Sequence, residues 1–137
     1  MIYPVLILIL NSFNINYSLN INIENINPSK GQLMIAVYNS KQLYMKTDKA
    51  VSKQILKLNG KNAEFIQFKD LPMGEYSVAV IHDENNNGKL DTNIFGIPTE
   101  AYGFSNNIRP KFRAANWDET KFLMNKNVGL NLKLDKW

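Results

Sequence analysis

The stretch FKDLPMGEYSVAV, residues 68–80, decides the fold, because it combines a tight change of direction with the start of an alternating strand. Pro72 fixes its own backbone φ, and Gly74 tolerates a left-handed turn. The chain is therefore expected to reverse after Leu71 and to enter a strand at Glu75. This arrangement predicts a sharp corner followed at once by a strand.

The tyrosine in this stretch indicates the kind of sheet. Tyr76 stands at the entrance of the predicted strand, and alternation places Val78 and Val80 on the same face. We expect its ring to lie in the core and its hydroxyl to bond nearby backbone, like the corner tyrosine of immunoglobulin-like domains. Leu-Pro-x-Gly-x-Tyr followed by alternating Val also resembles prealbumin-like and carboxypeptidase-regulatory-like sandwiches. Such sandwiches host many functions, so the pattern predicts fold and not activity.

Apolar and polar side chains alternate on both sides of this stretch, as expected for strands that bury one face. Residues 40–51 alone show a weak helical pattern, which predicts one short helix or helical turn at an edge. The sequence therefore predicts an all-β fold, an antiparallel β-sandwich of about seven strands that is immunoglobulin-like or prealbumin/transthyretin-like. The predicted strands lie at 19–23, 33–37, 51–58, 63–69, 75–83, 121–124 and 128–134.

Length and composition fit one folded domain and argue against several classes of function. The chain has 137 residues, of which 45% are hydrophobic and 20% charged, so it is long enough and apolar enough to bury a core. Its net charge of +4 is spread thinly, with one short basic run at 109–113, whereas nucleic-acid binders carry a denser stripe. With no Cys and a single His, a tetrahedral zinc site of nitrogen and sulfur ligands is excluded. We predict no nucleic-acid partner.

The first ten residues, MIYPVLILIL, are almost wholly apolar. The run is too short for a membrane span but has the length of the apolar part of a signal peptide. We predict a signal peptide at 1–18, cleaved near Ser18, and a single domain at 19–137 without a transmembrane helix. The protein is then exported to the periplasm, the cell envelope or the extracellular space. The sequence lacks an early basic residue and an Ala-x-Ala site, and the alternative is a buried first strand at 2–10.

IHDENNNGKLDTN, residues 81–93, carries the one pattern that indicates a metal. Oxygen-bearing side chains recur at alternate positions from Asp83, and Gly88 permits a sharp turn, as in the first part of a calcium loop. The twelfth position holds Ile94 instead of a bidentate Glu, so only weak calcium binding is expected. Carboxylates that would complete the site from elsewhere are Glu84, Glu100 and Asp118. The predicted ligands are Asp83, Asn85, Asn87, Asp91 and the backbone carbonyl of Lys89.

The segment 83–91, which we call the Asp/Asn loop, has a second interpretation as a polar turn. Asn, Asp and Gly are the commonest turn formers, since Asn and Asp side chains bond local backbone and all three tolerate positive φ. The Asn87-Gly88 pair is a strong hairpin signal and predicts a type I′ turn that needs no metal. Spacing alone leaves calcium loop and turn equally open.

HDENNNGKLDTNIFGIPTEAYGFSNN, residues 82–107, resembles the signature of a bacterial exported-protein family called domain of unknown function 2141. The strand QLMIAVYNS at 32–40, the LPMGEY turn and the N-terminal leader are also similar to that family. The resemblance covers nearly the whole chain after the leader. It implies a secreted or periplasmic β-sandwich and brings no activity, substrate or catalytic residue.

Residues 94–120 form a long segment rich in aromatic residues, of the kind that is often functional. In one interpretation, Phe104, Phe112 and Trp117 plug the open end of the sandwich. In the other, polar side chains beside the Asp/Asn loop form a patch in which rings and amides suit a glycan, a peptide or another small molecule. The predicted ligand patch consists of His82, Glu100, Tyr102, Ser105, Asn106 and Asn107. Alternation along its strand also predicts that His82 faces inward.

These features predict an exported binding or structural module of the cell envelope, with calcium as the one candidate cofactor. One alternative is a hydrolase that uses paired carboxylates near the loop. The pairs considered are Asp83 with Asp91, and Glu100 with Asp118. A second alternative is a purely structural accessory domain. No Gly-x-Ser-x-Gly elbow accompanies Ser105, and we assign no catalytic residue.

Overall fold

The structure, a computed structural model, describes residues 13–46 and 48–137. The first twelve residues of the predicted signal peptide lie outside this part of the chain, and so does the whole of the alternative strand at 2–10. The first strand of the structure begins at Asn16.

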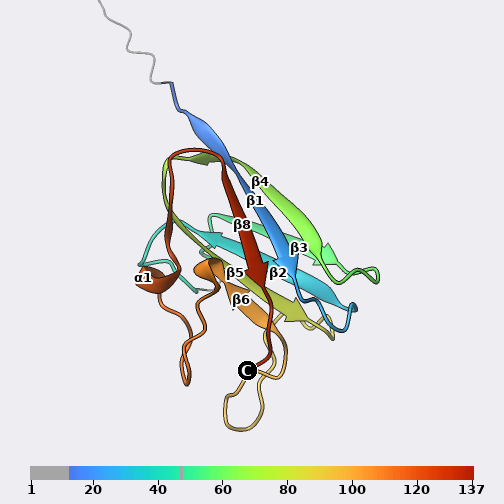
Figure 1. Cartoon of the computed structure of the whole chain (residues 1–137). Helices are drawn as coiled ribbons and strands as arrows, with labels where there is room; N and C mark the ends of the chain where they lie inside the picture. Colours follow the sequence, from blue (N-terminus) through green and yellow to red (C-terminus); the bar gives the residue numbers. More distant parts are fainter. Residues whose placement is uncertain (1–12, 47) are drawn as a thin grey trace, which may run out of the picture.

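Two β-sheets pack face to face and form a sandwich (Figure 1). The first sheet has the order β4-β1-β8. The second has the order β3-β2-β5-β6, and β7 pairs with the first residues of β5. The strands are β1 (Asn16–Glu24), β2 (Gln32–Tyr38), β3 (Ser52–Lys57), β4 (Glu64–Pro72), β5 (Gly74–Asp83), β6 (Tyr102–Phe104), β7 (Phe122–Met124) and β8 (Val128–Lys133).

The predicted all-β sandwich is confirmed, and each of the seven predicted strands has a counterpart. An eighth strand, β6, lies in the segment that the sequence treats as a long connection. The sandwich is not antiparallel throughout, because β1 runs parallel to β8, with Leu19 opposite Val128. A parallel pair needs a long connection between its strands, and here almost the whole domain lies between them. The other strand pairs among the described residues are antiparallel.

The main core lies between the two sheets and is built by alternating positions. Inward side chains of β1 and β2 are fully buried, whereas Asn20 and Asn22 between them stay partly exposed. Each large apolar side chain removed from water contributes roughly 1.5–3 kcal/mol, so this pattern also fixes the register of the strands. The buried side chains of the two strands are Leu19, Ile21, Ile23, Leu33, Ile35 and Val37.

The predicted corner joins the two sheets, because β4 pairs with β1 whereas β5 pairs with β2. Tyr76 is buried, and its hydroxyl donates a hydrogen bond to the carbonyl of Pro72 at 2.7 Å. The prediction of a corner tyrosine is thus confirmed. The prediction for Gly74 is wrong, since the left-handed residue of the corner is Asp70, with φ of 59°. An Asp side chain tolerates this conformation by bonding local backbone.

Helical structure is short: among the described residues, the predicted segment forms turns without a helix, and the two helices lie later in the chain. The described part of 40–51 forms turns at 41–45. The α-helix α1 (Trp117–Thr120) begins with a capping box, in which Asn116 accepts from the Glu119 amide and Glu119 accepts from the Asn116 amide. The 3₁₀ helix η1 (Ser105–Asn107) follows β6 directly. Across 13–46 and 48–137, no helix is long and apolar enough to span a membrane.

A second, smaller cluster covers the outer face of the second sheet. Phe104 and Trp117 are buried there, and the Tyr44 hydroxyl ties the 41–45 turns to Ala115 at 2.8 Å. Phe112 does not join them, because its side chain is 85% exposed. The predicted plug of the open end is therefore wrong. The cluster consists of Tyr38, Ala79, Phe104, Ala115 and Trp117.

Candidate functional site

The Asp/Asn loop starts at the last residue of β5, and its first carboxylate is buried. One oxygen of Asp83 accepts from the Asn87 amide at 3.1 Å, and the other from the Gly88 amide at 2.9 Å and the Gln32 side chain at 2.8 Å. Burial alone would raise the pKa of the Asp83 carboxyl. The hydrogen bonds from the Gly88 amide, the Gln32 side chain and the 86 and 87 amides outweigh it and hold the pKa below its ordinary value.

Three side chains of the loop meet at its exposed side. The amide nitrogens of Asn85 and Asn87 donate to the two carboxylate oxygens of Asp91, at 2.6 Å and 2.7 Å. Their amide oxygens accept from backbone, that of Asn85 from the Asn87 amide and that of Asn87 from the Lys89 amide. The loop thus closes through its own hydrogen bonds.

Glu100 connects the two ends of the loop, although it lies nine residues beyond Asp91. Its carboxylate is buried and accepts from the Glu84 amide and the Asp91 amide, both at 2.9 Å. Two otherwise unpaired amides at the base of the loop are satisfied in this way. The role of Glu100 in the structure is therefore to shape the loop.

The predicted type I′ turn at Asn87-Gly88 is wrong. That turn requires positive φ at both central residues, whereas the positive values occur at Asn86, with φ of 57°, and Gly88, with φ of 82°. The Asp83 carboxylate bonds the amides of residues 87 and 88 and imposes this different path. The segment is a turn held by a buried Asp.

The predicted calcium ligands fall into two groups. Asp83 is engaged on the buried side, while Asn85, Asn87 and Asp91 converge on the exposed side. A calcium ion at Asp91 would require the two amides to rotate and present their oxygens, which are the atoms calcium prefers. The residue types present, two amides and a carboxylate, are ones that calcium uses as ligands. Among the described residues, His, Cys, Asp and Glu form no group of three or more that would hold a metal.

The carboxylates that were to complete the calcium site have other partners. Glu84 pairs with Lys136 at 2.8 Å, and Glu100 bonds the backbone of the loop. Asp118 pairs with Lys41 at 2.6 Å, and this ion pair together with Lys121 lowers its pKa. Of the three carboxylates in the loop, Asp83 and Asp91 are therefore the two that have no ion pair within the described residues.

His82, from the predicted ligand patch, is a core residue. Its ring is fully buried, as the inward-facing prediction requires, and Nε2 lies 2.8 Å from the carbonyl oxygen of Lys30. Its backbone amide donates to Ala101 and so holds the segment before β6 against β5.

Ser105, Asn106 and Asn107, also from that patch, bind backbone of other elements. The Ser105 hydroxyl donates to Thr120 and accepts from the Val78 amide. The Asn106 amide donates to carbonyls at both ends of Glu119–Lys121, and Asn107 exchanges two hydrogen bonds with β8. These bonds hold η1 against α1 and β8. The three residues thus have a structural role in joining these elements.

Tyr102 alone among the six predicted patch residues lines a cavity. The Arg109 guanidinium lies 4.5 Å from the centre of its ring and donates to the Tyr102 carbonyl at 2.8 Å. Arg109 also donates to Asp135 at 2.7 Å, which draws the 108–114 segment and the C-terminal residues together.

The main concavity of the described surface is an apolar groove on the outer face of the second sheet. It consists of two adjoining cavities of about 520 Å³ and 720 Å³, which share Met45 and Leu90. The first cavity is lined by Met45, Leu90, Thr92, Phe95, Gly96, Ile97, Pro98, Tyr102, Phe104, Phe112, Arg113, Ala114 and Trp137. The second is lined by Met34, Ile35, Ala36, Tyr38, Met45, Asp48, Lys53, Gln54, Ile55, Ala79, Ile81, Gly88, Lys89 and Leu90. We call the two together the outer groove.

One feature of the sequence indicates this groove. The β2 stretch LMIAV is apolar at every position, so its outward side chains, Met34 and Ala36, are as apolar as its inward ones. A strand with one solvated face would alternate instead. The outward apolar residues of β2 and β5 form the floor of the outer groove.

The comparisons with known proteins address the family. A family model described as "Uncharacterized protein conserved in bacteria (DUF2141)" matches residues 21–130, from β1 into β8 and across the Asp/Asn loop. No curated protein matches the chain. No solved structure matches it either. Since the match spans most of the sequence, the resemblance seen in the sequence is confirmed, and the chain belongs to this family of bacterial proteins.

Proposed function

We propose that this protein is an exported module of the cell envelope that binds an elongated apolar ligand in the outer groove. The observation that carries the proposal is the groove itself, because its two cavities join at Met45 and Leu90 and are lined mainly by aliphatic, methionine and aromatic side chains. Their volumes are typical of sites for small molecules. Methionine at the junction suits a ligand of variable shape, since its side chain is unbranched and flexible.

An apolar ligand fits the groove better than a glycan does. Sugar recognition needs amides and carboxylates beside the aromatic rings, and the amides of Asn106 and Asn107 are bonded to backbone instead. The charged groups at the groove include Lys53, which pairs with Asp48, and Arg113, which pairs with Glu119. Lys89 has no ion pair within the described residues, and it suits an acidic head group on an otherwise apolar ligand.

Binding is also favoured over hydrolysis. A hydrolytic pair needs two carboxylates free to exchange protons with a substrate. Asp83, Asp91 and Glu100 each accept hydrogen bonds from the loop that they shape, and Asp118 pairs with lysines near α1. We therefore propose no catalytic role for them.

Dye binding tests the proposal. Ala36 lies on the floor of the groove, and Ala36→Trp would fill it with a bulky ring. We expect phenylnaphthylamine to fluoresce on binding and laurate to displace it. Ala36→Trp is expected to weaken both affinities by about tenfold or more, since the ring occupies the space of the ligand. The matched control is Asn131→Trp, an exposed position on β8 of the other sheet.

A second variant guards against damage to the fold. Met45 is 45% exposed and lies in a turn, so Met45→Glu is expected to fold and to place a charge where the two cavities join. Unchanged dye and laurate affinity in both groove variants would overturn the proposal. The proposal would also be overturned if Asn131→Trp weakened dye and laurate binding as much as Ala36→Trp does.

Export is part of the proposal and rests on the apolar run at 2–10. Fractionation of the producing bacterium, followed by N-terminal sequencing of the accumulated protein, tests it. We expect the protein in the periplasm, envelope or medium, with a new N-terminus near Ser18. An intact Met1 in the cytoplasmic fraction would contradict export.

We propose weak calcium binding at the Asp/Asn loop as a second property, supported by the convergence of Asn85, Asn87 and Asp91. At ten times its dissociation constant, calcium would stabilise the fold by about 1.4 kcal/mol. We expect the thermal midpoint to rise by several degrees between EDTA and millimolar calcium, and Asp91→Asn to abolish this rise. Equal midpoints in the unmodified protein would contradict calcium binding without affecting the groove proposal.

A further inference from the structure

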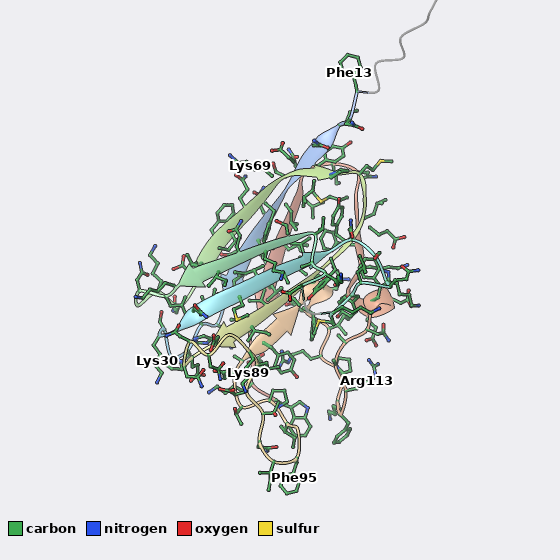
Figure 2. The ribbon with its side chains drawn as sticks, turned by 180° about the vertical axis from the view of Figure 1, so that it is seen from behind. Phe13, Lys30, Lys69, Lys89, Phe95 and Arg113 are labelled. Atoms are coloured by element: carbon green, nitrogen blue, oxygen red, sulfur yellow. The ribbon has the colours of Figure 1, made fainter. Side chains whose placement is uncertain are left out.

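Two loops leave the same end of the sandwich and carry exposed apolar side chains at their tips. Figure 2 shows Phe95 and Arg113 on these loops, with Phe13 at the opposite end of the molecule. In the segment 92–98, Ile94 is 93% exposed and Phe95 is 80% exposed. In the segment 108–114, Phe112 is 85% exposed, and its ring lies 5.9 Å from that of Trp137. We call these two segments the tip loops.

The first tip loop is held in a defined shape and does not fold its apolar residues away. The Asn93 side chain accepts from the amides of Phe95 and Ile97, at 2.9 Å and 3.1 Å. A β-bridge between Thr92 and Pro98 closes the loop at its base. The side chains of Ile94 and Phe95 are thus presented outward by a structured turn. Large apolar groups gathered at one exposed place commonly mark an interaction surface.

The charges of the tip loops have one sign. The segment 92–98 contains no charged residue, and 108–114 contains three cations and no acid. Arg113 pairs with Glu119, whereas Arg109 donates to neutral carbonyls and Lys111 has no ion pair in the part of the chain described. Arg109 and Lys111 line a hollow together with Phe112. Cations beside an exposed apolar tip match an interface in which apolar chains lie beneath anionic head groups.

We propose that the tip loops dock this protein on an anionic lipid bilayer. Ile94, Phe95 and Phe112 enter the boundary between head groups and acyl chains, and Lys111 and Arg109 remain at the level of the lipid phosphates. Large apolar side chains such as Phe favour this boundary because they bury apolar surface at the level where acyl chains begin. The contact is shallow and reversible, and it shares Phe95 and Phe112 with the lining of the outer groove, whereas Ile94 belongs to the tips alone. The opposite end of the sandwich, where β1 begins, then points away from the bilayer.

Vesicle binding tests this docking surface. We expect the purified protein to sediment with vesicles of phosphatidylcholine mixed with phosphatidylglycerol more strongly than with phosphatidylcholine alone. High salt is expected to reduce the difference, because it screens the lysine and arginine charges. The exposed Trp137 is expected to be quenched by brominated lipid, whereas the buried Trp117 is not.

Three variants and one control test whether the tip loops are responsible for vesicle binding. Ile94→Ser, Phe95→Ser and Phe112→Ser are each expected to weaken binding to anionic vesicles by about tenfold. Phe65→Ser is the matched control, because that side chain is 63% exposed on the first sheet, and it is expected to change nothing. All variants share one N-terminus, so any lipid affinity of the apolar leader is equal among them.

Ile94 separates this proposal from the proposed groove, since it lines neither cavity. Ile94→Ser is expected to lose vesicle binding and to keep its affinity for phenylnaphthylamine and laurate, whereas Ala36→Trp is expected to do the reverse. Equal binding to neutral and anionic vesicles would overturn the docking proposal. So would unchanged binding of the three tip variants, or a dimer in solution that the same variants dissociate.

Discussion

The Asp/Asn loop and the 108–114 loop lie in neighbouring parts of the chain but use their residues in opposite ways. The first is rich in the side chains that usually mark a site, and the structure directs most of them to one another and to backbone. The second belongs to the aromatic segment 94–120, and it leaves Phe112 almost fully exposed beside an apolar cavity. Residue type alone therefore does not tell whether a polar side chain is free to meet a ligand, because polar groups near backbone readily bond to it.

The largest expected effect breaks the Asp/Asn loop at its buried end. Asp83→Ala removes a buried carboxylate that accepts from the Gly88 amide, the Gln32 side chain and, beside Asn85, the Asn87 amide. We expect a loss of about 2–4 kcal/mol in the free energy of unfolding, measured by urea denaturation. Asp83→Asn, which keeps one acceptor oxygen, should lose less. A loss below about 0.5 kcal/mol in Asp83→Ala would show that this carboxylate does not organise the loop.

Acid should reveal the same carboxylate. Because the pKa of Asp83 is lower in the folded protein than its ordinary value of 3.8, its contribution is fully present above that value and is lost as pH falls below it. The pKa of Glu119 is lowered from 4.5 to about 2, mainly by the hydrogen bond from Arg113. We therefore expect the urea midpoint to fall from about pH 4.5 down to about pH 2.

Two variants show how much of the loss of stability in acid comes from Asp83 and how much from Glu119. Asp83→Asn should flatten the part of the curve below pH 3.8, and Glu119→Gln should flatten a smaller part, because its ion pair is at the surface. Identical curves for the unmodified protein and Asp83→Asn would contradict the lowered pKa of Asp83.

The corner offers an intermediate effect at the other end of β5. Tyr76→Phe removes the hydrogen bond from the hydroxyl to the Pro72 carbonyl and keeps the buried ring. We expect the free energy of unfolding to fall by about 1 kcal/mol. Calorimetry would measure it, with Tyr17→Phe as a partly exposed tyrosine control on β1. If Tyr76→Phe and Tyr17→Phe lowered the free energy of unfolding equally, the hydrogen bond of the corner tyrosine would not stabilise the fold.

The smallest effect on stability is expected in the 108–114 loop, in contrast to the Asp/Asn loop. Phe112→Ser changes a residue that is exposed in the 108–114 loop, so the free energy of unfolding is expected to stay within about 0.5 kcal/mol. Urea denaturation beside Asp83→Ala measures the contrast. A large destabilisation would mean that Phe112 packs in solution, and the exposed surface proposed here would then be absent.

The strands and the corner were predictable because they depend on local order. Alternation decides which side chains face the core, and Tyr76 lies four residues from its partner Pro72. His82 was placed inward for the same reason. The left-handed position was assigned to Gly74 instead of Asp70, since glycine is the usual choice there and an Asp is the less common one.

The candidate site was not predictable to the same degree, because its contacts cross the fold. Asn106 bonds carbonyls 13 and 15 residues away, and Asn107 bonds β8 across 24 and 26 residues. No spacing rule states whether such an amide faces solvent or backbone. The outer groove combines β2, β5 and the two tip loops, and the hydrophobic pattern of β2 alone hinted at it.

Mapping of a bound probe by NMR tests the central claim most directly. Backbone amide shifts would be followed while laurate is added to the protein. We predict that the perturbations gather along the outer groove, at Ala36, Met45, Ala79 and Leu90, and leave Asn85 to Asn87 nearly unchanged. Perturbations confined to Asn85, Asn87 and Asp91, with Ala36, Met45 and Ala79 unchanged, would contradict the claim that the apolar face binds and the polar loop supports it.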